Sequence, residues 1–96
     1  MIQPTYTRLA LQDLARIHVW SVTNFGSDQA DLYLRQIEAR LVQAARAPGL
    51  FRDASSVRPG LVKLRTGSHV AYVLSAPGLL QVVRILHGRM DPDRWV

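Results

Sequence analysis

Residues 82–91 read Val82-Val83-Arg84-Ile85-Leu86-His87-Gly88-Arg89-Met90-Asp91, an apolar run that contains an arginine and ends in polar groups. The β-branched and apolar residues predict a strand that ends near His87. An arginine within a buried strand is costly unless it is paired or serves a site. Arg84 is therefore the first candidate for a functional residue.

We expect this strand to span residues 79–87. Two more β segments precede it. Residues 61–66 and 69–75 are rich in apolar and β-branched side chains. Gly67-Ser68 and Ala76-Pro77-Gly78 separate the segments and have the length and composition of hairpin connections. The sequence therefore predicts a three-stranded antiparallel meander.

The N-terminal part of the chain changes from a β pattern to a helical one. Residues 2–7 are short and β-prone, and Pro4 suits an edge position. From Leu9 onward, apolar residues recur every three or four positions as far as Phe25, and Gly26 is placed to end the helix. This pattern predicts a short strand, whose pairing partner stays open, followed by a first helix.

A second helix follows at once. Ser27 is a suitable N-cap, an apolar stripe continues through Ala45, and Pro48-Gly49 stops the helix. The short join predicts an antiparallel helical hairpin. Residues 50–60 contain turn-forming residues and predict a loop.

These elements predict an α+β fold in a single domain over residues 1–96. An N-terminal strand, a helical hairpin and a meander make a sheet with the helices on one face. A chain of 96 residues with 48% hydrophobic content supports one modest core.

Strand alternation assigns the side chains to the two faces of the sheet. We expect Val83 and Ile85 to share the side that meets the helices, with Arg84 on the opposite side. Lys63 and Arg65 also share a side, so the simplest assembly lines the helix-free face with three cations. That face is a possible seat for phosphate or carboxylate groups. The alternative is that Arg84 pairs with a nearby acid, either Asp91 or the terminal carboxylate at Val96.

Composition excludes several classes of function. There are no cysteines, so no disulfide, thiolate nucleophile or cysteine metal site is possible. His69 and His87 flank the meander without a nearby carboxylate or cysteine at ligand spacing, and we expect a structural or capping role for both. We expect His18 to be a hydrogen-bonded, partly buried imidazole. No cofactor is expected.

Charge and hydropathy indicate the compartment and the kind of partner. The net charge is +5, and residues 49–96 hold seven Lys or Arg against three acids, which favours an anionic partner there. The first residues lack a signal peptide pattern, and no apolar run is long enough to span a membrane. We therefore expect a soluble cytoplasmic protein. The tail at residues 91–96 places Trp95 beside Arg94, a composition typical of protein interfaces.

The chain resembles the ParE branch of the RelE/ParE toxin superfamily, the toxins of bacterial toxin–antitoxin pairs. The specific matches are the turn Gly67-Ser68-His69-Val70 and the run from Val83 to His87 with Arg89-Met90-Asp91. Weaker matches lie in the helical hairpin and its ends: Ala10, Asp13, Leu14, Ile17, Phe25, Gly26, Gln29, Ala30, Pro48, and Arg94 in the tail.

This resemblance implies a non-catalytic toxin that inhibits DNA gyrase, supports plasmid stabilisation and forms a hetero-oligomer with a ParD-like antitoxin. Carried onto this sequence, the gyrase contact is expected at Arg84, His87, Arg89, Arg94 and Trp95. The antitoxin contact is expected at Leu11, Leu14, His18, Tyr33, Ile37, Lys63 and Arg65. Direct binding to membranes or nucleic acid is not expected.

Two other functions fit parts of the sequence. A RelE-like ribosome-dependent mRNA endonuclease would need a general base, a general acid and cations on the phosphate. Arg65 and Arg84 supply cations, whereas His87 is the one credible proton carrier and its strand parity places it away from Arg84. A nucleic-acid-binding module fits the charge but lacks the aromatic ladder that such proteins use.

Overall fold

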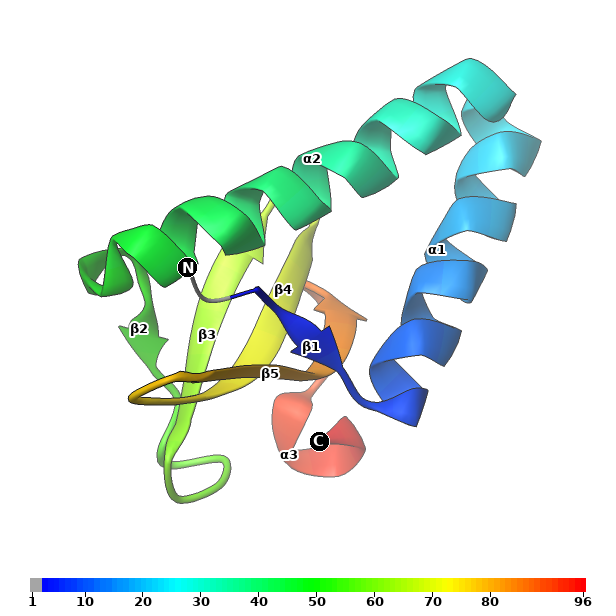
Figure 1. Ribbon diagram of the computed structural model, residues 1–96. Helices are drawn as coiled ribbons and strands as arrows, with labels where there is room; N and C mark the ends of the chain where they lie inside the picture. Colours follow the sequence, from blue (N-terminus) through cyan, green and yellow to red (C-terminus); the bar gives the residue numbers. More distant parts are fainter. Residues whose placement is uncertain (1–2) are drawn as a thin grey trace.

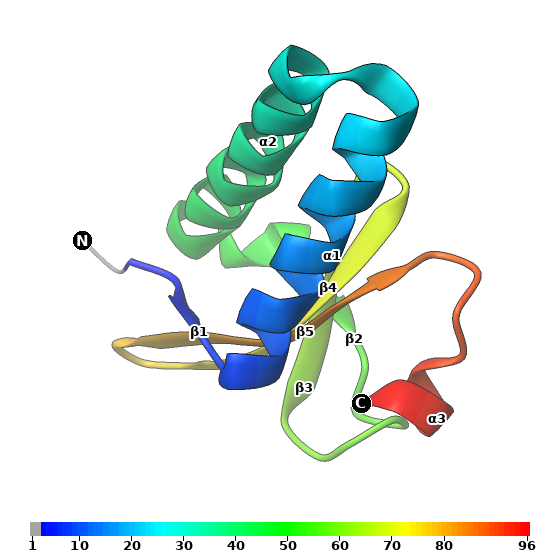
Figure 2. The ribbon, with the colours of Figure 1, turned by 90° about the vertical axis from the view of Figure 1, so that its right-hand side faces the viewer.

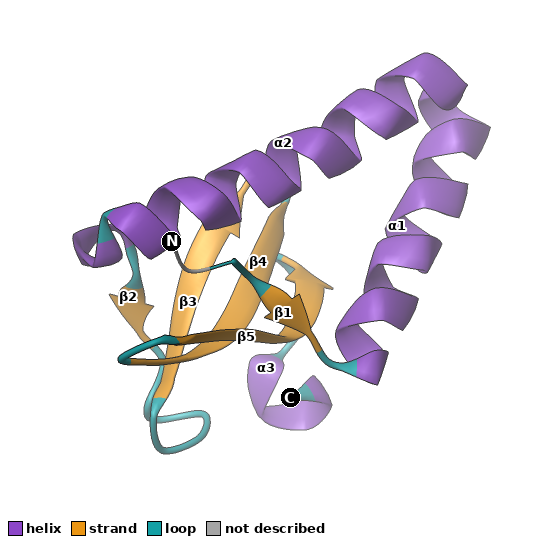
Figure 3. Cartoon of the chain, viewed as in Figure 1, coloured by secondary structure: helices purple, strands orange, loops and turns teal. Residues whose placement is uncertain are grey.

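The computed structural model describes residues 3–96 and forms one mixed sheet with two long helices (Figures 1 and 3). The predicted N-terminal strand included Ile2, which lies outside the described residues. In chain order the elements are β1 (Thr5–Tyr6), α1 (Arg8–Phe25), α2 (Ser27–Arg46), the 3₁₀ turn η1 (Pro48–Leu50), β2 (Arg52–Asp53), β3 (Leu61–Thr66), β4 (His69–Ala76), β5 (Leu79–His87) and α3 (Pro92–Trp95).

The sheet has the strand order β1-β5-β4-β3-β2. The antiparallel meander of β3, β4 and β5 is confirmed, and β4 extends one residue beyond the predicted end. β1 pairs in parallel with β5, which answers the question of its partner. The prediction of a continuous loop over 50–60 was wrong, because β2 pairs with β3 through Arg52 opposite Lys63.

The two long helices form the predicted hairpin, with shifted ends. α1 begins at Arg8 rather than Leu9, because the Thr7 hydroxyl caps it by accepting from the Ala10 N–H at 3.1 Å. Gly26, at φ 88°, both ends α1 and precedes α2. Ser27 is therefore the first residue of α2 rather than its cap.

Apolar side chains pack on both faces of the sheet. The larger cluster lies between the helices and the sheet, and it includes Ile17, Ile37, Leu41, Leu64 and Ile85. A second cluster, which we call the lower cluster, occupies the opposite face and consists of Ala54, Leu61, Tyr72, Val83 and Leu86. The short helix α3 lies on that side, across the sheet from α2 (Figures 1 and 2).

A β-bulge in the central pair of strands changes the predicted faces. Tyr72 pairs with Arg84 and Val73 with Val82, so Val83 is an extra residue in β5. Val83 therefore joins the lower cluster, while Ile85 meets the helices. The prediction that these two residues share a face was wrong, since alternation was interrupted between them. Arg84 shares the face of Tyr72, as predicted from alternation, but its side chain is not clear of the helices, because the guanidinium reaches Asp13 of α1.

The register also places the other two predicted cations. Lys63 lies opposite Tyr72 and Arg65 opposite Val70, so both are on the lower face and exposed. This agrees with the predicted sharing of one face by Lys63, Arg65 and Arg84.

The tight turn between β3 and β4 offers a test of the packing of α2 on the sheet. Gly67 has φ 60°, and a Cβ there would lie 2.7 Å from the Tyr33 ring and hydroxyl. We expect Gly67→Ala to lower the free energy of unfolding by about 2–4 kcal/mol through backbone strain and displacement of Tyr33, measured by urea denaturation.

Gly78→Ala is the matched control, because Gly78 also has positive φ (77°) but open space around it. It should cost about 1–2 kcal/mol from strain alone. Equal losses in the two variants would show that the contact with Tyr33 contributes nothing.

Candidate functional site

Arg84 is neither exposed nor paired as predicted. Its side chain is 8% exposed and forms a two-pronged ion pair with Asp13 of α1: Nε donates to Oδ2 at 2.8 Å and Nη2 donates to Oδ1 at 2.9 Å. Nη1 donates to the main-chain carbonyl of Trp95 at 2.6 Å. The prediction of Asp91 or the terminal carboxylate as the partner was wrong, because the guanidinium is paired with Asp13, which lies 71 residues earlier in the chain.

Asp13 reaches Arg84 because β1 is short. β1 covers β5 only at Gln81 and Val82, which leaves the β5 edge open beyond that point. The Ile85 N–H donates to Asp13 Oδ2 at 2.9 Å, so a side chain from α1 takes the place of a neighbouring strand. The hydrogen bonds to Asp13 raise the pKa of Arg84 above its usual value, against the opposing effect of burial.

This pairing removes the predicted three-cation seat on the lower face. Arg84 is buried and neutralised, so of the three predicted cations Lys63 and Arg65 remain exposed there. Arg65 Nε donates to the Gly67 carbonyl at 3.2 Å, which holds the guanidinium near the turn. The two exposed cations do not converge with Arg84 on a ligand.

A groove of about 630 Å³ opens on the helix side of the sheet. Its apolar walls come from α1 and β5, with Ile17, Trp20, Phe25 and Ile85 among the lining side chains. Trp20 and Phe25 are 57% and 64% exposed and touch edge to face, with ring centroids 5.6 Å apart. Exposed aromatic pairs of this kind are typical of surfaces that bind other proteins.

Neither Trp20 nor Phe25 was predicted to be a site residue. The signal was present, because Trp20 lies off the buried stripe of α1 and is still a large aromatic residue. The groove itself forms because α1 stands apart from the sheet, and the spacing of residues within one helix does not predict that arrangement.

Tyr33, His69 and His87 form a polar cluster at one end of this groove. The Tyr33 hydroxyl lies 2.7 Å from His69 Nδ1 and accepts a hydrogen bond from the Ser68 N–H at 3.0 Å. The two imidazoles meet edge to face with centroids 5.4 Å apart. His87 Nδ1 accepts from the Arg89 N–H at 3.1 Å, which confirms its predicted capping role.

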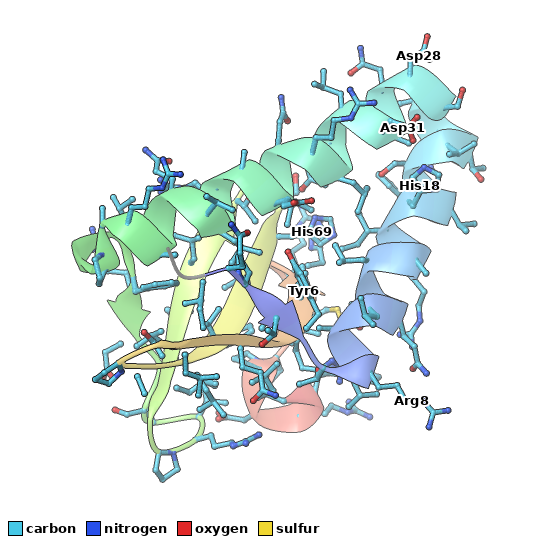
Figure 4. The ribbon with its side chains drawn as sticks, in the orientation of Figure 1. Tyr6, Arg8, His18, Asp28, Asp31 and His69 are labelled. Atoms are coloured by element: carbon cyan, nitrogen blue, oxygen red, sulfur yellow. The ribbon has the colours of Figure 1, made fainter. Side chains whose placement is uncertain are left out.

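The electrostatics of this cluster favour a neutral His69. Burial lowers the pKa of the His69 imidazole below its ordinary value of 6.5, the nearby His87 lowers it further, and Asp13 partly opposes both. Figure 4 shows His69 beneath α2, near the end of the sheet. Within residues 3–96, no group of three His, Cys, Asp or Glu side chains is placed to hold a metal ion.

The residues expected at the antitoxin contact fall into exposed and buried groups. Leu11 is 54% exposed on α1. Leu14 packs against the main core, and Ile37 is only 1% exposed within it. The assignment of Ile37 to a binding surface was wrong, because the same stripe of α2 faces the sheet.

His18 is confirmed as a hydrogen-bonded, partly buried imidazole. Its Nε2 lies 2.9 Å from Asp31 Oδ1. Figure 4 shows the two residues near each other on α1 and α2. This pair is partly open to solvent, so it remains accessible to a partner.

The C-terminal tail presents exposed charge and aromatic surface. Asp91 caps α3 by accepting from the Asp93 N–H at 3.0 Å. The Arg94 guanidinium lies over the Trp95 ring, 5.9 Å from its centroid, and the Trp95 side chain is 45% exposed. Arg89 and His87 are also exposed, at the start of the connection to α3.

Comparison with known proteins gives consistent matches over nearly the whole chain. A family model described as "ParE toxin of type II toxin-antitoxin system, parDE" matches residues 5–92. The chain is 39% identical over 94 residues to Toxin ParE1 of Mycobacterium tuberculosis, covering 92% of this chain and 96% of that protein. It is 33% identical over 86 residues to Toxin ParE of Escherichia coli, covering 88% and 84% respectively.

A solved structure agrees in fold. The chain is similar to one from the "Chromosomal ParDE TA system from P. aeruginosa", with a TM-score of 0.74, 21% identity, and coverage of 91% of this chain and 96% of that one. No helix among residues 3–96 is both long enough and apolar enough to cross a membrane.

The lowered pKa of His69 predicts a pH dependence of stability. Below pH 6.5 the unfolded chain takes up a proton at His69 more readily than the folded protein does, so the free energy of unfolding falls as pH falls. We expect His69→Gln to reduce this loss between pH 7.5 and 5.5, measured by urea denaturation at each pH. An unchanged pH dependence in the variant would contradict the assigned burial of His69.

Proposed function

The chain belongs to the ParE toxin family of type II toxin–antitoxin systems, and on that premise we propose that it inhibits DNA gyrase by protein–protein contact until a ParD-like antitoxin neutralises it. The observation that carries this proposal is the family match over residues 5–92, joined to two surfaces suited to protein partners, the groove and the tail, which meet at His87. The proposed action is non-enzymatic and cytoplasmic, and plasmid stabilisation is the expected cellular consequence.

The groove is the proposed antitoxin site. Trp20 and Phe25 offer apolar surface that a partner would cover, and Arg16 at the rim is exposed and basic. An amphipathic antitoxin segment with acidic residues beside its apolar ones matches both features. Leu11, His18 and Tyr33 stay within this proposal as flanking contacts.

Lys63 and Arg65 remain candidates for a second antitoxin contact. Both are exposed on the lower face, where an acidic stretch of the antitoxin would meet them. Leu14 and Ile37 are withdrawn as contacts, because the main core already uses their side chains.

The tail is the proposed gyrase site. His87, Arg89, Arg94 and Trp95 are exposed along the connection from β5 to the chain end. Arginine and tryptophan are the residue types that contribute most often to interface hot spots. Arg84 is withdrawn as a direct contact, since its guanidinium is buried and hydrogen-bonded within the fold.

The endonuclease alternative loses one of the two cations that it needs to bind a phosphate. Arg84 is not available to a phosphate, because all three of its nitrogens donate to protein acceptors. His69 and His87 lie side by side, but the first is held by Tyr33 and the second by the Arg89 main chain. Inhibition by contact therefore remains the better supported function.

A supercoiling assay tests the proposed target. Purified protein should inhibit gyrase-driven supercoiling in a concentration-dependent way, and an equimolar ParD-like antitoxin should restore activity. Absence of inhibition, together with cleavage of mRNA on ribosomes, would replace this proposal with the endonuclease.

Substituting two exposed tryptophans, one on each proposed surface, tests the antitoxin site and the gyrase site independently. Trp20→Ala should weaken antitoxin binding by about 30-fold, as loss of an aromatic anchor does, with little effect on gyrase inhibition. Trp95→Ala should do the reverse. Isothermal titration against the antitoxin and the supercoiling assay measure the two effects.

Both side chains are largely exposed, so neither truncation is expected to unfold the protein, and each variant serves as the control for the other. If both variants lose both activities to the same extent, the two surfaces are not separate.

A further inference from the structure

We propose that Asp13, Arg84 and the main chain at Trp95 form a latch that positions the C-terminal tail for its contact, with Arg84 as a positioning residue. The existence of the latch is independent of the target. Its functional consequence rests on the proposed function, since it concerns the surface assigned to gyrase.

The geometry of the guanidinium supports this role. Two of its nitrogens are held by Asp13 on α1, which fixes the orientation of the planar group. The third, Nη1, then points at the Trp95 carbonyl at 2.6 Å. α1 and β5 together therefore aim a charged donor at one peptide group of the tail.

The tail has few other means of staying in place. α3 has four residues, and such a short helix is not stable by itself. Its own hydrogen bonds are short-range: Asp93 N–H to Asp91 Oδ1 at 3.0 Å, Arg94 N–H to the Asp91 carbonyl at 3.1 Å and Val96 N–H to the Pro92 carbonyl at 2.9 Å. Met90 and Val96 add partial packing against the lower cluster.

The latch acts on the main chain and leaves the side chain of Trp95 outside. The carbonyl faces the buried guanidinium, whereas the indole remains 45% exposed beside Arg94. A fixed backbone with an exposed ring reduces the entropy lost when the ring binds a partner. The arrangement uses all three donor positions of the guanidinium, which no lysine reproduces.

Arg84→Lys in the full-length chain tests the latch by amide hydrogen exchange. A lysine ammonium carries its three N–H donors on one nitrogen, so it does not reproduce the spread of the guanidinium nitrogens over the Asp13 carboxylate and the Trp95 carbonyl. We expect the amides of Arg94 and Val96 to exchange at least about tenfold faster than in the wild type, while β3 and β4 amides keep their protection. Gyrase inhibition should fall by more than antitoxin affinity does.

Two variants provide matched controls. Arg35→Lys makes the same chemical change at an exposed position of α2 and should alter neither exchange nor inhibition. Trp95→Ala keeps the carbonyl, so it should retain tail protection while losing inhibition. Unchanged tail protection in Arg84→Lys, or loss of tail protection in Trp95→Ala, would overturn the proposal.

Nuclear magnetic resonance of the wild-type protein decides the matter even if Arg84→Lys does not fold. The Arg84 Nη1 protons should exchange slowly and show Overhauser contacts to the main chain of Trp95 or Val96. Rapid exchange without those contacts would overturn the latch. If the latch is present and the wild-type protein does not inhibit gyrase, the proposed function fails and the latch stands.

Discussion

The ion pair between Asp13 and Arg84 is the interaction on which the arrangement of this protein depends. It joins α1 to β5 at the point where β1 stops pairing, and the same carboxylate accepts the free N–H of Ile85. Removing one partner of such a buried pair costs about 3–5 kcal/mol, because the other charge is left uncompensated. A hydrophobic pair of similar size could supply comparable stability, so the value of these residues lies in the geometry they impose.

That geometry sets the positions of the two surfaces proposed to bind protein partners. The groove lies between α1 and the helix side of the sheet, and the tail leaves β5 toward the opposite face. Asp13 lines the groove and also holds the guanidinium that binds the tail. An antitoxin in the groove and a target at the tail would therefore meet residues of one hydrogen-bonded network, and the two contacts would share His87 at their boundary.

Local sequence patterns predicted the helices, strands and turns well, but they did not predict the β-bulge or which faces of the helices are covered by the sheet. The hairpin turns and helix stops were visible because glycine, proline and apolar spacing act within a few residues. The bulge at Val83 was not visible, because an extra residue in a strand shows itself only against its partner strand. Ile37 was misassigned for a related reason: an amphipathic stripe indicates that a face is covered without showing whether the sheet or a partner covers it.

The sequence alone determined the α+β architecture, the meander, the family resemblance and the presence of an arginine that needed a partner. Only the tertiary structure decided that the partner is Asp13, that the Trp95 carbonyl completes the site, and that Trp20 and Phe25 border a groove. The physical reason is distance along the chain. Propensity and periodicity act between near neighbours, whereas a buried charge is satisfied by whichever group the packing of helix on sheet brings within hydrogen-bonding reach.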